Sequence, residues 1–285
     1  MSQEFHYRLP RRVGGWRPGS HRGSSLGTGL EFVSHMSLFD RPDPRRLDLR
    51  ASLRHTGDDW LVRVNRQRVG IPVYVLVDVS PSMSFGAPQT KLQVIADFVE
   101  ALGQSAFRVG DALGLLAFDD EERPELFMPA MLSRGMGSVM AAQLRAWQSR
   151  PGGGEGRLGL DDAALYLAGR RGLVFLVSDF HWDLEQASPV LDLLVRAHVV
   201  PMVVWDTAEI EPPREDVIAP MQDMESGRRR VLWLRPKLRQ QWRDGVARRR
   251  TQLGQFFAAR GLHPFFVCGA FNGEALSQYF FETVA

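Results

Sequence analysis

The feature that most constrains the fold is an apolar run, residues 73–77, that ends in an aspartate, Asp78. A continuous apolar and mostly β-branched run is typical of a central parallel strand that is buried on both faces of a sheet. Similar runs occupy residues 112–118, 173–177, 199–205 and 264–268. Because segments with helical apolar spacing separate these runs, the sequence predicts an α/β fold with a doubly wound, mostly parallel sheet, similar to Rossmann-like folds.

The rest of the chain is organised around this sheet. Helices are predicted over residues 91–107, 138–147, 160–168, 184–197, 238–260 and 274–281. Residues 1–70 form an N-terminal extension, with a flexible, basic arm over residues 1–30 followed by a β segment that includes a strand at 60–64. Residues 71–285 form the α/β domain, with a short strand at 125–128 and a small β insertion at about 207–236.

Charge is concentrated at the two ends of the chain. The first 70 residues hold 13 arginines against seven acidic residues, and residues 228–260 hold 11 basic residues against Asp244 alone. Solvent-exposed charge explains such ends more simply than nucleic-acid binding, so we do not expect nucleic acid as a partner. The chain has no apolar run long enough for a membrane helix or a signal peptide, and we therefore expect a cytoplasmic protein without membrane insertion.

Polar oxygen donors follow two of the predicted strands. Asp78 is followed by Ser80 and Ser82, and Asp179 follows the strand at residues 173–177. Ligands of open α/β sheets bind beyond the carboxyl ends of the strands. Carboxylates and hydroxyls are hard ligands that suit Mg²⁺ or Mn²⁺. The simpler alternative is that Asp78 and the serines only cap the following helix.

Three enzyme classes fit the sequence poorly. A phosphatase that forms an aspartyl-phosphate needs a second acid two residues after its nucleophile, and Ser80 occupies that position after Asp78. The glycine-rich residues 152–156 lack the lysine of a phosphate-binding loop. A Gly-x-Ser-x-Gly pattern occurs at residues 23–27, but it lies in the predicted N-terminal arm and not at a turn from a buried strand to a helix, where a nucleophile elbow would stand. We therefore expect a protein that is not an enzyme, and a metal-dependent hydrolase is the weaker alternative.

These residues resemble the metal-ion-dependent adhesion site of von Willebrand factor A (VWA) domains. In that resemblance Asp78, Ser80 and Ser82 are its Asp-x-Ser-x-Ser motif, and Asp179 is the later aspartate. Residues 43–52 and 76–83 further resemble signatures of a bacterial VWA-like family, domain of unknown function 58. The resemblance covers about residues 30–285.

The resemblance implies a function in protein interaction. Members of this family are associated with MoxR-type AAA+ ATPases, with which they are thought to act, in a chaperone-like manner, on the maturation or activation of a client protein. In VWA domains the metal keeps a coordination position for an acidic residue of the partner. The resemblance thus implies an adaptor with Mg²⁺ or Mn²⁺ at its site, and the alternative is a metal-independent scaffold with a degenerate site.

One ligand of the resembled site is missing. Gly156 stands where the family pattern expects a threonine, so Glu155 or a water is expected to supply that oxygen, or Arg157 a fixed positive charge in place of the ion. His181 and Trp182, next to Asp179, are expected on the rim of the site, where they contact the partner together with Arg157. The alternative for His181 and Trp182 is that they cover the edge of the core.

Overall fold

The computed structural model describes residues 4–9, 18–27, 29, 31–57, 59–121, 123–148, 158–222, 224 and 227–284. The chain divides into two compact units. The larger unit comprises Met1–Arg8 and Pro72–Ala285, and the smaller unit comprises Leu9–Ile71.

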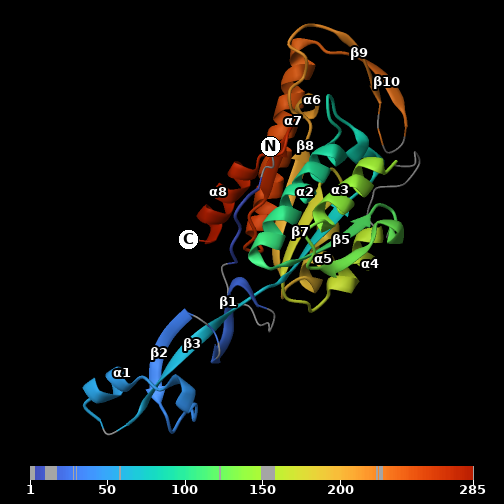
Figure 1. The fold of residues 1–285 in the computed structure, drawn as a ribbon. Helices are drawn as coiled ribbons and strands as arrows, with labels where there is room; N and C mark the ends of the chain where they lie inside the picture. The colour runs from blue at the N-terminus through green and yellow to red at the C-terminus, as the bar shows by residue number, and fades with distance from the viewer. Residues whose placement is uncertain are drawn as a thin grey trace. The chain divides into compact units, whose positions relative to one another are not determined.

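A six-stranded sheet forms the centre of the larger unit (Figure 1). Its strand order is β11-β8-β7-β4-β5-β6, and all neighbouring strands are parallel except the antiparallel pair β5 and β6. The strands are β4 (Pro72–Asp78), β5 (Ala112–Phe118), β6 (Met128–Met131), β7 (Leu173–Ser178), β8 (His198–Trp205) and β11 (Phe265–Cys268). The predicted α/β class with a mostly parallel sheet is confirmed.

The order of the strands places a topological switch point beside β4. The chain passes from β4 to β5 on one side, and later to β7 and β8 on the other side. Val77 of β4 pairs with Val177 of β7, so the two strands end at the same level. The crevice at such a switch point, beyond the carboxyl ends of the strands, is where open α/β sheets bind ligands.

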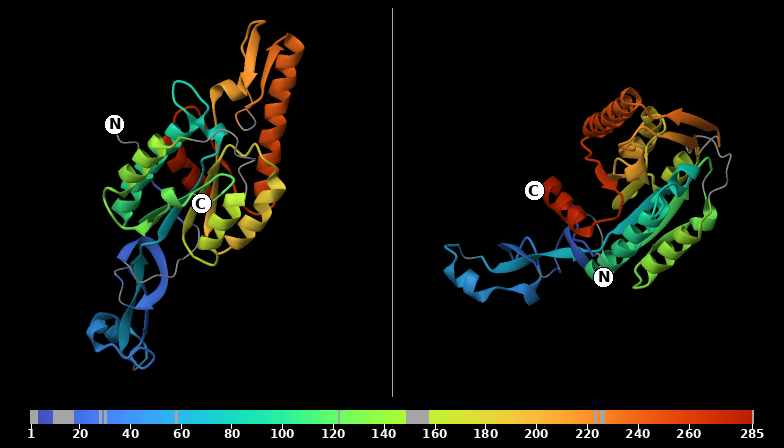
Figure 2. Two further views of the ribbon diagram at one scale, coloured as in Figure 1. Left: turned by 90° about the vertical axis from the view of Figure 1, so that its right-hand side faces the viewer. Right: turned by 90° about the horizontal axis from the view of Figure 1, so that it is seen from above.

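Helices cover both faces of this sheet (Figures 1 and 2). They are α2 (Lys91–Val109), α3 (Met136–Ala146), α4 (Leu158–Leu167), α5 (Ala187–Leu193), α6 (Thr207–Ile210), α7 (Pro236–Ala258) and α8 (Gly273–Val284). Leu76 and Leu176 share one buried cluster with residues of α4, α5 and α7. On the other face, the ring of Phe175 packs against Phe98 of α2 and Phe280 of α8, at centroid distances of 5.0 and 6.1 Å.

Helix α2 is fixed at both ends and packs closely on α3. Thr90 and Gln93 form a capping box at its start, and Gly110 ends it in the left-handed conformation with φ of 84°. Gly103 of α2 lies against Gly137 of α3, so closely that a Cβ on Gly103 would lie 2.4 Å from the Gly137 Cα. The crossing therefore requires glycine.

The smaller unit is an antiparallel sheet in the order β1-β3-β2, with β1 (Pro18–Gly27), β2 (Glu31–Ser37) and β3 (Leu61–Val69). Two short helices, η1 (Pro44–Arg46) and α1 (Leu49–Arg54), lie within its sequence. Asp48 accepts a hydrogen bond from the Ala51 N–H at the start of α1 and pairs with Arg63 of β3 at 2.7 Å. These bonds hold the pKa of Asp48 below its usual range.

The structure corrects three local predictions. The first 30 residues are not simply a flexible arm, because residues 18–27 form β1 and because Phe5 and Tyr7 are buried in the larger unit. The strand expected at residues 125–128 is a short 3-10 helix, η3 (Pro124–Leu126), followed by β6. The helix expected over 184–197 is shorter: it consists of a 3-10 turn, η4 (Leu184–Gln186), and α5.

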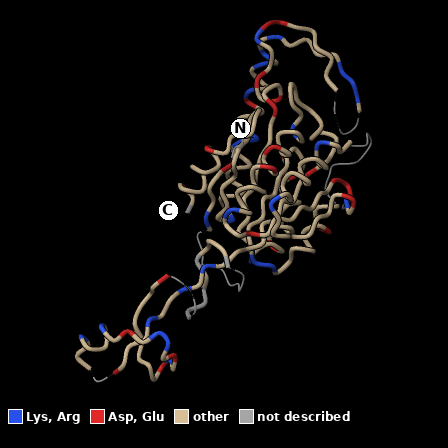
Figure 3. Tube along the Cα trace, in the orientation of Figure 1, with Lys and Arg blue, Asp and Glu red and all other residues tan. Residues whose placement is uncertain are grey.

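The predicted insertion contains helix α6 and a two-stranded hairpin, β9 (Ile218–Gln222) with β10 (Arg229–Trp233). Basic residues occur along β10, where they are coloured blue in Figure 3. Within the described part of the chain, none of the helices combines the length and the apolar character that a membrane crossing requires.

Candidate functional site

Asp78 is the centre of a buried hydrogen-bond network at the end of β4. Its side chain has no exposed surface. One carboxylate oxygen, Oδ1, accepts the backbone N–H of Ser80 at 3.0 Å, and the other, Oδ2, accepts the hydroxyl of Ser178 at 2.6 Å. Ser80 and Ser82 lie together, with their hydroxyl oxygens 3.2 Å apart. The strand-end loop therefore brings one carboxylate and two hydroxyls to one place.

Asp179, at the end of β7, joins the same site. It is 1% exposed, and it accepts a hydrogen bond from the Ser82 side chain. Its Oδ1 also accepts the backbone N–H of His181 at 3.2 Å. The structure thus brings together all four residues that the sequence suggested as metal ligands, Asp78, Ser80, Ser82 and Asp179.

A lysine that the sequence analysis did not place at the site is its nearest cation. The ammonium of Lys91, the first residue of α2, lies 2.7 Å from Asp179 Oδ2 and 2.7 Å from Glu209 Oε1. The Lys91 side chain is 2% exposed. Glu209, on α6, is held in place because its other oxygen accepts the backbone N–H of Asp206 at 2.9 Å.

The charges of the site are strongly coupled. Burial, and after it the nearby negative charge of Asp179, raise the pKa of Asp78 to about 7. Burial acts in the same direction on Asp179, but the ammonium of Lys91, the His181 side chain and the Ser82 hydrogen bond together outweigh it, so the pKa of Asp179 lies below its usual value. Burial opposes the charge of Lys91, yet Asp179 and Glu209 together raise its pKa above the usual value. Asp179 is therefore a stable anion, whereas Asp78 forms no ion pair within the part of the chain that the structure describes.

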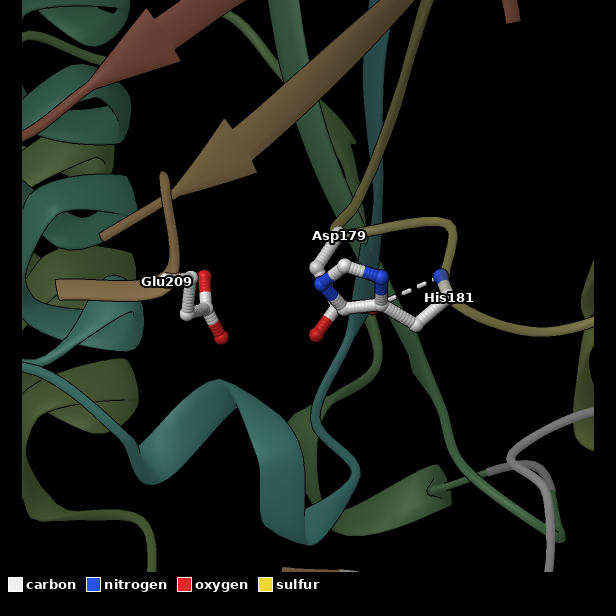
Figure 4. A group of neighbouring side chains, drawn as sticks. All are labelled: Asp179, His181 and Glu209. Atoms are coloured by element: carbon white, nitrogen blue, oxygen red, sulfur yellow. Dashed lines mark hydrogen bonds between the residues drawn. The ribbon is translucent and has the colours of Figure 1, made fainter. Parts of the chain in front are cut away.

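A second group of possible metal donors overlaps the first. Donor atoms of Asp179, His181 and Glu209 lie within 4.8 Å of one another. In Figure 4 the carboxylates of Asp179 and Glu209 point toward each other. Lys91 already bridges these two carboxylates, so the positive charge that this group attracts is present in the chain itself.

The loop after Asp179 is held in an unusual conformation. Phe180 has a φ of 51°, in the left-handed region that a bulky residue rarely adopts, and its side chain is fully buried. Arg249 of α7 donates from Nε to the Phe180 carbonyl at 3.1 Å, and its guanidinium also donates to the Trp182 carbonyl. Backbone strain of this kind persists where the surroundings fix it, and it is concentrated at functional sites.

His181 and Trp182, the residues expected on the rim of the site, differ in their exposure and contacts. His181 is exposed and stacks on Trp205, with the ring planes 4° apart. Trp182 is half-buried, and its indole N–H donates to the Ser178 hydroxyl at 3.1 Å, so it supports the hydroxyl that binds Asp78. Glu155, Gly156 and Arg157, with the missing threonine position, lie outside the described residues.

Some of the missed residues left a signal in the sequence. Lys91 is one of only two lysines, and it begins a helix, where the helix dipole disfavours a positive charge. Glu209 stands three residues after Asp206 in a capping-box pattern, which is a sufficient structural reason for it and which hid its second contact. Arg249 gave no such signal, because it lies within one of several arginine runs.

Comparison with known proteins identifies relatives over most of the chain. The chain is 26% identical over 252 residues to the uncharacterized protein Rv1480 of Mycobacterium tuberculosis, covering 87% of this chain and 77% of the relative. An uncharacterized protein of Mycobacterium bovis, Mb1516, matches to the same extent.

Solved structures of similar fold are more distant. BatB from Bacteroides thetaiotaomicron is 15% identical, with a TM-score of 0.45, over 75% of this chain and 98% of that one. The SpRpn10 VWA domain is 12% identical, with a TM-score of 0.39, over 74% of this chain and 93% of that one. Proximal thread matrix protein 1 from the mussel byssus, solved with a zinc-occupied MIDAS motif, is 16% identical, with a TM-score of 0.37, over 48% and 38%.

A family model matches residues 42–252, which include the strand-end aspartates, Lys91 and Glu209. It is described as the protein of unknown function DUF58. The chain belongs to the DUF58 family.

Proposed function

We propose that this protein is a non-catalytic adaptor that binds an acidic residue of a partner protein through a divalent cation at the ends of β4 and β7. One observation carries the proposal. Asp78 and Asp179 lie buried at the switch point of the sheet with the hydroxyls of Ser80 and Ser82, and among the described residues Lys91 alone forms ion pairs there, with Asp179 and Glu209.

The charge balance favours a bound cation. Asp78, Asp179 and Glu209 together carry three negative charges when ionised, and Lys91 supplies one positive charge. A buried carboxylate without a compensating charge is costly, which is the reason that the pKa of Asp78 lies at about 7. A divalent cation would neutralise the remaining two charges and would let Asp78 ionise at neutral pH.

The donor chemistry fits Mg²⁺ or Mn²⁺. Asp78, Ser80, Ser82 and Asp179 offer only oxygen atoms, and each carboxylate oxygen can accept more than one partner. The group with His181 is the weaker choice, because Lys91 already lies between Asp179 and Glu209. The cation would supply a charge bridge to the partner's carboxylate, and the protein residues would hold it and orient its open side.

The partner is the part of the proposal that rests on the family resemblance alone. We infer a cytoplasmic, chaperone-like function in which the protein acts with a MoxR-type AAA+ ATPase on the maturation or activation of a client protein. The support is membership of the DUF58 family.

A metal-independent scaffold is the second candidate. It is favoured by Lys91, which pairs with two carboxylates of the site and so acts as a built-in cation. In this case the hydrogen-bonded carboxylates stabilise the fold, and the partner binds elsewhere.

A pull-down from the native host distinguishes the two candidates. Tagged full-length protein is used in Mg²⁺, in EDTA, and as Asp78→Ala in Mg²⁺, with Asp192→Ala, an exposed aspartate of α5, as the matched control. The adaptor proposal predicts that an AAA+ ATPase or a client is retained only by the wild type and the control in Mg²⁺. If the same partner is retained in EDTA and by Asp78→Ala, the scaffold is correct.

A further inference from the structure

A pocket of about 310 Å³ opens beside the candidate cation site. Two of its lining residues, His181 and Glu209, contact the cation site. The lining also includes Trp205, at the end of β8, and Trp242 and Arg249 of α7. Its volume lies at the lower limit of small-molecule sites, which occupy roughly 300–1,000 Å³, so it suits one large side chain better than a cofactor.

The walls of this pocket are fixed by bonds to the site itself. The indole N–H of Trp205 donates to the Asp179 carbonyl at 2.9 Å, and that of Trp242 donates to the Glu209 carbonyl at 2.7 Å. Both indole N–H groups are already bonded, so the rings contribute carbon atoms to the lining. Trp205 is only 3% exposed, and most of the apolar wall open to an occupant therefore comes from the half-buried Trp242, Ile210 and Val246. The His181 ring, stacked on Trp205, extends this surface toward the cation site.

Arg249 adds positive charge to the same pocket. Its guanidinium donates to the carbonyls of Phe180 and Trp182, and it forms no ion pair with a carboxylate among the described residues. An arginine in a protein stays charged. The pocket is thus apolar in its walls and positive at one side, next to a site for a cation.

We propose that this pocket binds a large apolar side chain, aromatic or long aliphatic, that lies close in sequence to the acidic residue engaged by the cation site. This inference rests on the proposed function and defines its partner as a short acidic segment with an apolar anchor. The apolar walls account for the anchor, and the charge of Arg249, together with that of the proposed cation, complements an acidic segment.

Synthetic peptides test this directly. The probes are fluorescein-labelled heptapeptides with a central Asp, in which each flanking position in turn carries Gly, Ala, Leu, Phe or Trp, titrated against full-length protein in Mg²⁺. Burial of a large apolar side chain predicts about ten- to hundredfold tighter binding for Phe or Leu than for Gly at one flanking position. An affinity that is the same at every flanking position would overturn the inference.

Variants locate this preference. Val246→Trp fills the pocket, so the ratio of the affinities for the Phe-containing and the Gly-containing peptide falls to about one. Val195→Trp, a matched change at an exposed valine outside the pocket, leaves the ratio unchanged. A ratio that survives Val246→Trp overturns the inference.

Tryptophan resonances supply evidence that does not depend on a variant's folding. In wild-type protein labelled with ¹⁵N-tryptophan, the Phe-containing peptide shifts the indole N–H signals of Trp205 and Trp242. The signal of Trp233, which is 52% exposed on β10, stays in place. Shifts confined to other tryptophans contradict the pocket.

The same titrations separate this inference from the proposed function. In one outcome, binding depends on the flanking residue and is lost with Val246→Trp, yet is unaffected by EDTA and by Asp78→Asn. This result supports the pocket and refutes the cation bridge. Binding that requires Mg²⁺ and Asp78 but shows no flank preference keeps the bridge and refutes the pocket.

Discussion

Replacement of Asp78 by asparagine is expected to stabilise the metal-free protein at alkaline pH. The carboxylate of Asp78 is fully buried near Asp179, and its pKa is raised from 3.8 to about 7. The folded state therefore holds a proton on Asp78 between about pH 4 and pH 7, where the unfolded state has lost it. Because the folded state binds more protons in this window, stability from this group falls as pH rises through it.

The size of this effect follows from the displacement of the pKa. About three pH units, at about 1.4 kcal/mol per unit, correspond to about 4 kcal/mol of stability lost by pH 8. Asparagine has nearly the same shape and carries no charge, so Asp78→Asn escapes this loss. It keeps an acceptor for the Ser80 N–H. Its amide faces the Ser178 hydroxyl, which already accepts the N–H groups of Phe180 and Trp182, and this mismatch costs about 1–3 kcal/mol at every pH, less than the loss that the variant escapes at pH 8.

Urea unfolding in EDTA at pH 5 and pH 8 measures the effect. Groups outside the site titrate alike in both proteins, so the difference in unfolding free energy between Asp78→Asn and the wild type isolates this carboxyl together with its coupling to Asp179. We expect the difference to shift in favour of Asp78→Asn by about 2–4 kcal/mol from pH 5 to pH 8. Asp192→Asn, at an exposed position, is expected to show no such shift. A pH-independent difference for Asp78→Asn would refute the reasoning.

Three further predictions follow from the same structure. Lys91→Met leaves the carboxylates of Asp179 and Glu209 without their buried cation, so the free energy of unfolding, measured in urea, should fall by about 3–5 kcal/mol. Lys237→Met, at an exposed lysine, should change it by less than about 0.5 kcal/mol, and equal effects of the two substitutions would contradict the importance of the ion pairs. The affinity for a divalent cation, measured by calorimetry, should rise about tenfold per pH unit up to about pH 7 and then level off, because the cation must displace the proton of Asp78. An affinity that does not change from pH 5 to pH 8 would exclude Asp78 as a ligand. Gly103→Ala should lower the free energy of unfolding by about 1–3 kcal/mol, because its Cβ would lie 2.4 Å from the Gly137 Cα. Gly254→Ala, whose Cβ would meet nothing within 4 Å, should instead raise it by about 0.5–1 kcal/mol. No change in stability for Gly103→Ala would show that the two helices can separate without cost.

The elements that the sequence predicted well are those with local signals. The apolar runs at residues 73–77 and 173–177 became β4 and β7, because a strand buried on both faces needs a continuous apolar run. The spacing of Asp78, Ser80 and Ser82 marked the site for a similar reason, since a strand-end loop of a few residues brings these side chains together without help from distant parts of the chain.

Contacts over long sequence separations escaped prediction. Lys91 pairs with Asp179 and Glu209 across 88 and 118 residues, and nothing in the local sequence fixes which carboxylates the start of α2 will meet. Phe5 and Tyr7 stand in a segment without periodicity, yet Tyr7 donates to Asp111 at 2.6 Å from 104 residues away. Such pairs depend on the order of the strands and on helix placement, and these emerge only from the complete fold.

The most direct test of the account is a titration of Mn²⁺ into EDTA-treated, desalted protein at pH 8, followed by electron paramagnetic resonance of the free ion. The account predicts that wild-type protein and Asp192→Asn each remove one equivalent of Mn²⁺ from solution, that Mg²⁺ competes for it, and that Asp78→Asn removes none. Equal uptake by the wild type and Asp78→Asn, or no uptake by either, would contradict the claim that the carboxylates at the ends of β4 and β7 hold a divalent cation.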